Sequence, residues 1–161
     1  KYLDSQPAIK QTNKEHELKF PFSIRPLLSV WKWLNFESVL AENKPADDPA
    51  LSRGAYLVNG PGHCAECHSP RNLLGGLDRD RFLQGNPDGP EGESVPGITM
   101  DKQFRISEWS SEDIMFSLQI GMVPDGDFLG GSMGHVIENS TSKLNEKDLK
   151  AITAYLQSVG R

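Results

Sequence analysis

The two cysteines of this sequence lie close together and are followed directly by a histidine. The motif Cys64-Ala65-Glu66-Cys67-His68 contains every cysteine of the 161-residue chain. Two thiols three positions apart project from one turn of backbone, so each can add to one vinyl group of a haem, and the adjacent histidine is delivered to the iron. The spacing therefore indicates one covalently attached c-type haem, held by Cys64 and Cys67, with His68 as the proximal axial ligand.

Three other kinds of site use the same residue types. A zinc site would need two more ligands, and the other histidines, His16, His63 and His135, have no paired spacing. A thioredoxin-like dithiol would need alternating strands and helices, which the sequence does not show. A plain disulfide leaves His68 without a role, so haem attachment accounts best for the motif.

The distal ligand of the iron is a separate question, because four methionines follow the motif: Met100, Met115, Met122 and Met133. Met133 lies in Gly130-Gly131-Ser132-Met133-Gly134, where glycines allow the backbone to approach a haem face closely. A thioether ligand favours reduced iron and raises the potential. We expect Met133 as the distal ligand. Met122, which follows a glycine expected to end a helix, is the alternative, and His135 or an open position stays open.

Composition excludes several classes of function. The net charge is −5, and 37% of the residues are hydrophobic, which suffices for one modest core. The apolar stretch from Pro26 to Phe36 is broken by Lys32 and is far shorter than the roughly 20 residues that span a bilayer. An acidic chain without a basic run lacks the positive footprint of a nucleic-acid-binding protein. We therefore expect neither a membrane span nor a nucleic-acid partner.

Charge also divides the chain. Residues 1–44 contain seven Lys/Arg and five Asp/Glu, whereas residues 45–161 contain ten and seventeen. We predict an N-terminal extension or interdomain linker over 1–46 and one domain over 47–161. The chain begins without Met, and residues 1–6 resemble residues 154–159. We expect a processed or excised piece whose first residues form the tail of a preceding related domain, with chance similarity as the other interpretation.

The second part of the chain shows helix signals and no strand alternation. Helices are predicted over 49–58, 111–120, 133–138 and 146–159, with Asp48, Ser110 and Asn145 as N-caps and Gly121 and Gly160 as stops. Ser110 and Asp113 have the spacing of a capping box. Residues 75–105 are rich in Gly, Pro, Asp and Arg and predict a long ordered loop. The expected fold class is all-α.

Several motifs together resemble the mono-haem class I cytochrome c domains of multi-haem cytochromes, including the cytochrome subunits of bacterial membrane-bound alcohol and sugar dehydrogenases. The likeness covers residues 53–157. The matching segments are Arg53–Val58, Gly62–Asn72, Ile98-Thr99, Trp109-Ser110, Asp113-Ile114, Pro124–Phe128, Gly130–Met133 and Ala151–Leu156. The resemblance implies a cytochrome c fold of about four to five helices around one covalent haem, with long Gly/Pro-rich loops and His68 and Met133 as axial ligands.

Five further residues are candidates for the haem environment. Arg71 and Asn72 have side chains that can hydrogen-bond haem propionates, and the alternative is a surface turn after the motif. Trp109 precedes a capped helix, where an indole N–H near a propionate competes with simple core packing. Ile98 and Thr99 are included because they match the family pattern.

The resemblance implies a periplasmic electron carrier rather than an enzyme, relaying single electrons between a dehydrogenase or other redox enzyme and a respiratory or extracellular acceptor. The acidic domain predicts a redox partner with a basic docking patch. An upstream cytochrome domain or a dehydrogenase subunit is the expected neighbour. Membrane association is expected only through parts outside this chain or through the apolar segment 27–36. The alternative is a haem enzyme or small-ligand sensor with an open or labile sixth iron position.

Overall fold

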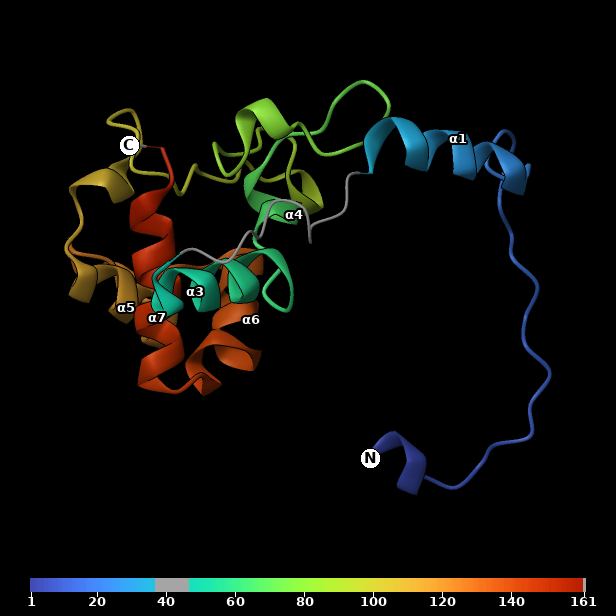
Figure 1. Cartoon of the computed structure of the whole chain (residues 1–161), viewed down its shortest axis with the longest axis horizontal. Coiled ribbons are helices and arrows are strands. Elements are labelled where there is room, and N and C mark those ends of the chain that lie inside the picture. The colour runs from blue at the N-terminus through green and yellow to red at the C-terminus, as the bar shows by residue number, and fades with distance from the viewer. Residues whose placement is uncertain (37–46, 161) are drawn as a thin grey trace. The chain divides into compact units, whose positions relative to one another are not determined.

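The structure is a computed structural model that describes residues 1–36 and 47–160. The chain forms two compact units, Lys1–Leu34 and Asn35–Arg161 (Figure 1). The predicted boundary between residues 46 and 47 borders the segment 37–46, which lies outside the described residues. Within the described ranges, no helix is long and apolar enough to cross a membrane.

The first unit contains a single-turn 3₁₀ helix, η1 (Leu3–Ser5), and nearly all of α1 (Arg25–Asn35). The sequence analysis did not predict α1. Its apolar residues Leu27, Val30 and Leu34 recur at the i, i+3, i+7 spacing of an amphipathic helix. That spacing was the available signal for this helix.

The second unit is helical, and its described residues contain isolated β-bridges but no strand. The all-α prediction is confirmed. The α-helices are α3 (Pro49–Asn59), α4 (Ala65–His68), α5 (Ser111–Ile120), α6 (Gly131–Asn139) and α7 (Glu146–Ser158). The loop between α4 and α5 contains the 3₁₀ helices η2 (Arg79–Arg81), η3 (Pro90–Gly92) and η4 (Arg105–Glu108), and η5 (Thr141–Lys143) precedes α7.

Local capping chemistry sets the bounds of the predicted helices. The Asp48 side chain accepts a hydrogen bond from the Ala50 amide at the start of α3. Ser110 forms the predicted capping box at the start of α5, and Gly121 ends that helix in the left-handed conformation, at a φ of 80°. Asn145 caps α7, but α7 ends at Ser158 and not at residue 159 as predicted. Fraying of a last turn commonly shifts a helix end by one residue.

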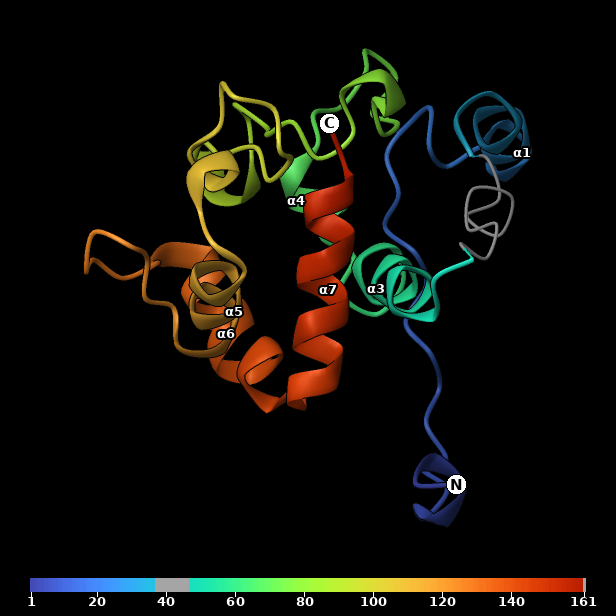
Figure 2. The same cartoon turned by 60° about the vertical axis from the view of Figure 1, so that its left-hand side comes forward.

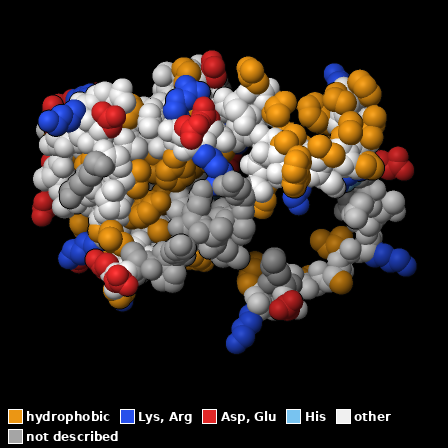
Figure 3. Space-filling view, turned by 45° about the horizontal axis from the view of Figure 1, so that its top comes forward, with side chains coloured by type: hydrophobic (Ala, Val, Ile, Leu, Met, Phe, Trp, Pro, Cys, Tyr) orange, Lys and Arg blue, Asp and Glu red, His pale blue; other side chains and the backbone are white. Residues whose placement is uncertain are grey.

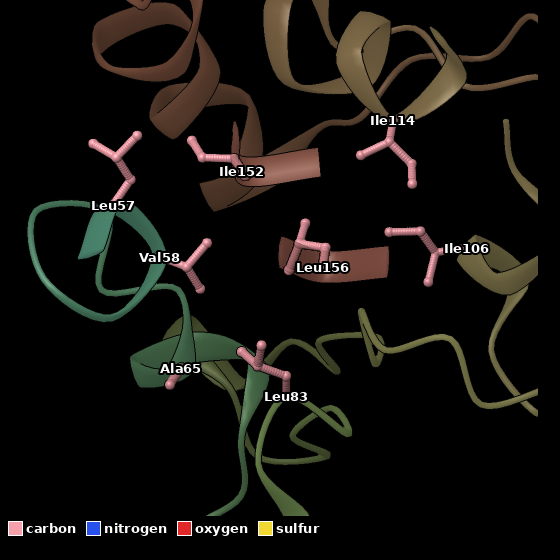
Figure 4. Close-up of a cluster of buried hydrophobic side chains, with 8 residues drawn as sticks. All are labelled: Leu57, Val58, Ala65, Leu83, Ile106, Ile114, Ile152 and Leu156. Carbon is pink, nitrogen blue, oxygen red and sulfur yellow. The ribbon is translucent and has the colours of Figure 1, made fainter. Parts of the chain in front are cut away.

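The core lies where α7 crosses α3 and contacts α5, an arrangement visible in both cartoon views (Figure 2). Its buried side chains come from α3, α4, α5, α7, η4 and the loop between α4 and α5 (Figure 4): Leu57, Val58, Ala65, Leu83, Ile106, Ile114, Ile152 and Leu156. Ala65 belongs to α4, so the short helix that carries the cysteine motif is anchored directly in this core.

An ion pair fastens α3 to α7 beside the core. The Arg53 guanidinium donates to both carboxylate oxygens of Asp148, at 2.8 and 3.0 Å. It also lies 5.5 Å from the centre of the Tyr56 ring. Asp148 is buried, and the hydrogen bond from Arg53 holds the pKa of its carboxyl below the ordinary value.

Candidate functional site

The two cysteines lie at the ends of one helical turn. The amides of Cys67 and His68 both donate to the carbonyl oxygen of Cys64, at 3.2 and 2.9 Å. Both thiols are free and half-buried. Burial raises the pKa of the Cys64 thiol to about 11, so it is protonated at neutral pH. The structure therefore presents two unpaired thiols from one turn, as addition to two vinyl groups of one haem requires.

A tight turn delivers the chain from α3 into this motif. The Gly62 amide donates to the Leu57 carbonyl at 2.8 Å, and the Cys64 amide donates to the Val58 carbonyl at 3.1 Å. His63 has a positive φ of 35°, a region that few non-glycine residues adopt. These bonds attach the first cysteine to the buried end of α3.

The histidine of the motif is held in one tautomer. Nδ1 of His68 lies 2.8 Å from the carbonyl oxygen of Pro96. Because a carbonyl oxygen only accepts, Nδ1 must carry the hydrogen and donate. Burial lowers the pKa of His68, which favours the neutral ring. In a neutral ring with Nδ1 protonated, Nε2 carries the free lone pair that binds a metal.

The loop after the motif returns to the same place through two more hydrogen bonds. The buried Ser69 hydroxyl accepts from the Leu83 amide at 2.8 Å. The His68 carbonyl accepts from the Gly85 amide at 2.7 Å. Together with Pro96, these contacts hold both the backbone and the ring of His68 from one continuous loop. Sequence reasoning missed Ser69, Leu83 and Pro96 as parts of this site.

The two methionine candidates for the distal ligand, Met133 and Met122, lie on separate elements. Met133 is the third residue of α6 and is half-buried. Met122 follows α5 in a turn bridged to Phe128 and is also half-buried. Met100 packs against the hydrophobic core, and His135 is exposed on α6. Gly131, with a φ of 56°, opens α6 two residues before Met133. The choice of Met133 stays a prediction.

Arg71 and Asn72 lie in the turn that follows the motif. Arg71 forms an ion pair with Glu66 on α4. The Asn72 side-chain oxygen accepts from the amides of Leu74 and Gly76, at 2.9 and 3.0 Å, and so closes the turn. The structure gives both residues a role in shaping this turn, and their predicted contact with haem propionates stays a prediction.

The other three candidates lie along the core. Ile98 and Trp109 are partly buried and pack against the hydrophobic cluster. Thr99 is almost fully buried. The Ile98 amide donates to the Leu83 carbonyl at 2.8 Å, which connects this part of the loop to the residue bonded to Ser69.

The zinc alternative has no support in the described part of the chain. No group of three or more His, Cys, Asp or Glu side chains is placed to hold a metal ion there. The donor set that the structure does assemble is two free thiols and one imidazole nitrogen, with a backbone carbonyl behind the imidazole. This donor set fits a covalently bound haem with one protein axial ligand already oriented.

Comparison with known proteins agrees with this donor set. The sequence is 44% identical over 160 residues to a protein named diheme cytochrome c-type from Cereibacter sphaeroides, covering 98% of this chain and 51% of that protein. The chain is homologous to cytochrome c subunits. It is 32% identical over 166 residues to the gluconate 2-dehydrogenase cytochrome c subunit of Pantoea cypripedii, with 99% and 37% covered.

A third relative extends the comparison to a sugar dehydrogenase. The chain is 36% identical over 148 residues to the fructose dehydrogenase cytochrome subunit of Gluconobacter japonicus, covering 89% of this chain and 29% of that subunit. Cytochrome subunits named for quinone alcohol dehydrogenases match as well. The predicted resemblance is confirmed, and these names agree with an electron carrier rather than a catalytic subunit. No family model matches the sequence.

Coverage limits what carries over from these relatives. The chain spans about half the length of the diheme relative and about a third of the gluconate dehydrogenase subunit. Relatives named cytochrome c imply haem c as the cofactor. The chain itself contains two cysteines, both in the motif.

Proposed function

We propose that this chain is a cytochrome c domain that carries one haem c and transfers single electrons. One observation carries the proposal: two free thiols lie at the ends of one helical turn, beside a histidine whose Nδ1 is bonded to the Pro96 carbonyl. The fixed tautomer leaves Nε2 free to bind iron. Homology to cytochrome c subunits supports the same conclusion from an independent direction.

Each residue then has one task. Cys64 and Cys67 would hold the haem through thioether bonds, and Nε2 of His68 and the thioether of Met133 would be the protein ligands of its iron. When bound, the haem supplies a reversible one-electron change of its iron. The Pro96 carbonyl keeps the imidazole oriented and raises its basicity as a ligand.

The proposed setting is the bacterial periplasm, with a dehydrogenase as electron donor and a respiratory or extracellular acceptor. The relatives named as cytochrome subunits of dehydrogenases support this setting. The unit Asn35–Arg161 contains eleven Lys/Arg and nineteen Asp/Glu. Such an acidic unit favours partners with a basic docking patch, and association should slow as salt screens the attraction.

A visible spectrum of the reduced and oxidised protein, with carbon monoxide added to the reduced form, tests the proposal. We expect one haem per chain, a low-spin spectrum with the weak far-red methionine–iron band, and no change with carbon monoxide. Haem that is covalently attached should stay on the wild-type chain during denaturing electrophoresis. The variant Cys64→Ser/Cys67→Ser should show no such haem. A spectrum that shifts with carbon monoxide would instead favour a haem enzyme or ligand sensor with an open sixth position.

Two matched variants test the distal ligand. Met133→Ala should abolish the far-red band, admit carbon monoxide and lower the reduction potential, because loss of a thioether removes the preference for reduced iron. Met122→Ala removes the same side chain at a half-buried turn and should preserve all three properties. The reverse pattern would assign the ligand to Met122.

A further inference from the structure

Helix α1 of the unit Lys1–Leu34 exposes an apolar surface that the proposed electron transfer does not use. The side chain of Trp33 is 81% exposed, and Val30 and Leu34 are each more than half exposed. Hydrophobic side chains gather over α1 in the space-filling view (Figure 3). Surfaces of this kind mark contact with another protein or with a membrane.

Both cations of α1 lie on one side of the helix. Arg25, Ser29 and Lys32 are four and three positions apart, so they lie within a narrow arc at 100° per residue. Leu27, Val30 and Leu34 occupy the opposite arc by the same spacing. The helix is therefore amphipathic, with both of its cations opposite the apolar arc.

The exposed apolar surface continues into the turn before the helix. Phe20, Phe22 and Ile24 are exposed there. The turn is ordered by hydrogen bonds, since the Ile24 amide donates to the Pro21 carbonyl and the Leu27 amide donates to the Ile24 carbonyl, each at 3.0 Å. The apolar surface therefore runs from the turn onto the helix.

Charge identifies the occupant of this surface. The unit Lys1–Leu34 contains six Lys/Arg and three Asp/Glu, the opposite sign to the unit Asn35–Arg161. Tryptophan beside lysine and arginine on a short amphipathic helix is typical of segments that lie in the interface of a bilayer. A basic helix is attracted to anionic lipid headgroups, at about 1 kcal/mol for each Lys or Arg near the surface.

We propose that α1 and the turn before it bind the surface of an anionic lipid bilayer. The apolar residues enter the boundary between headgroups and acyl chains, and Arg25 and Lys32 contact the lipid phosphates. The helix has eleven residues and lies in the plane of the interface without crossing the bilayer. This proposal is independent of the haem ligands and stands or falls separately from the proposed electron transfer.

Flotation of the haem-loaded full chain with lipid vesicles tests the proposal. We expect binding to vesicles of phosphatidylcholine and phosphatidylglycerol at a ratio of about 7:3, weaker binding in high salt, and little binding to phosphatidylcholine alone. Tryptophan fluorescence should shift to shorter wavelength as the indoles of α1 leave water.

Two pairs of variants separate the apolar and ionic parts. Val30→Ser/Trp33→Ser should weaken binding at least about tenfold, because two exposed apolar side chains no longer enter the lipid. Leu73→Ser/Phe128→Ser removes equally exposed apolar side chains from the other unit and should bind like the wild type.

A second pair of variants tests the contribution of the two cations in the same way. Arg25→Gln/Lys32→Gln should weaken binding about fivefold for each charge removed. Lys102→Gln/Lys147→Gln removes two exposed lysines of the other unit and should have little effect. All variants should keep the haem spectrum and the far-UV circular dichroism of the wild type.

Three results would overturn the proposal. The first is absence of binding to either kind of vesicle. The second is binding that Val30→Ser/Trp33→Ser leaves unchanged. The third is self-association of the chain, measured by sedimentation, that α1 variants abolish while no vesicle binding occurs, since the occupant would then be a second copy. None of these results alters the carbon monoxide test of the haem site.

Discussion

Gly54 lies where α3 crosses α7, and a methyl group at this position should force the two helices apart. An ideal Cβ on Gly54 would lie 2.0 Å from the carbonyl oxygen of Ala151 and 2.7 Å from Cβ of Tyr155. Ordinary contact begins at 3.4 Å. The Gly54→Ala variant therefore requires a separation of about 1.4 Å against backbone atoms that no rotamer change can move.

The expected loss of stability exceeds the gain from helix propensity. Replacing glycine by alanine inside a helix favours folding by about 1 kcal/mol. Overpacking of this kind costs about 1–3 kcal/mol, occasionally more. Because α3 and α7 form the most extensive helix contact of the unit, we expect a cost near the upper end of this range and a net loss of about 2 kcal/mol, roughly a 30-fold change in the folding equilibrium.

Urea unfolding followed by circular dichroism at the helical minimum measures this effect. Gln119→Ala is the control, because Gln119 is exposed in α5 and the change to alanine gains helix propensity without adding an atom between two helices. This control should be neutral or stabilising. A Gly54→Ala variant as stable as the wild type would refute the close crossing of α3 and α7.

Three further predictions concern hydrogen bonds. Ser69→Ala should cost about 1–3 kcal/mol in urea unfolding, because the buried Leu83 amide loses its acceptor, and an unchanged midpoint would contradict that bond. Ser110→Ala should cost about 1 kcal/mol through loss of the N-cap of α5, with Ser110→Thr as a partial rescue. The pKa of Asp148 is lowered by Arg53, so the unfolded chain binds this proton first as pH falls. The stability that the Arg53–Asp148 pair contributes is fully present above the pKa that Asp148 has in the unfolded chain. It is lost as pH falls through the lower pKa that Asp148 has in the folded protein. In the Asp148→Asn variant, the free energy of unfolding should therefore fall less steeply as the pH is lowered. An unchanged pH dependence would assign the loss of stability in acid to other carboxylates.

The helices of the second unit followed from sequence wherever a local rule decided their ends. Each of the three N-caps, Asp48, Ser110 and Asn145, accepts a hydrogen bond from a backbone amide two or three residues further along the chain. These interactions therefore depend only on residues that are close together in the sequence. The same holds for the cysteine motif, whose two thiols lie in one turn.

Features that depend on distant residues were not predictable in this way. Pro96 contacts His68, 28 positions away, through its backbone carbonyl. Every residue has such a carbonyl, so residue type cannot indicate this contact. The choice between Met122 and Met133 depends on distant residues for a related reason, since both methionines lie beside glycines in the sequence and only the tertiary arrangement distinguishes them. Helix α1 is a different case, because its spacing was present in the sequence but was interpreted only as an apolar run.

The hydrogen bonds that hold the loop to His68 also determine where this protein tolerates change in length. The Asn86 amide donates to the Val95 carbonyl at 2.9 Å, and the Val95 amide donates to the Asn86 carbonyl at 2.8 Å. The segment between them is therefore a loop whose two ends are held together. For such a closed loop the conformational entropy grows only with the logarithm of its length, and doubling it costs about 0.6 kcal/mol. A peptide tag or a partner-recognition sequence inserted between Asp88 and Glu93 should therefore leave the orientation of the His68 imidazole unchanged. This loop is then a suitable position for attaching the domain to an electrode surface or to a foreign enzyme.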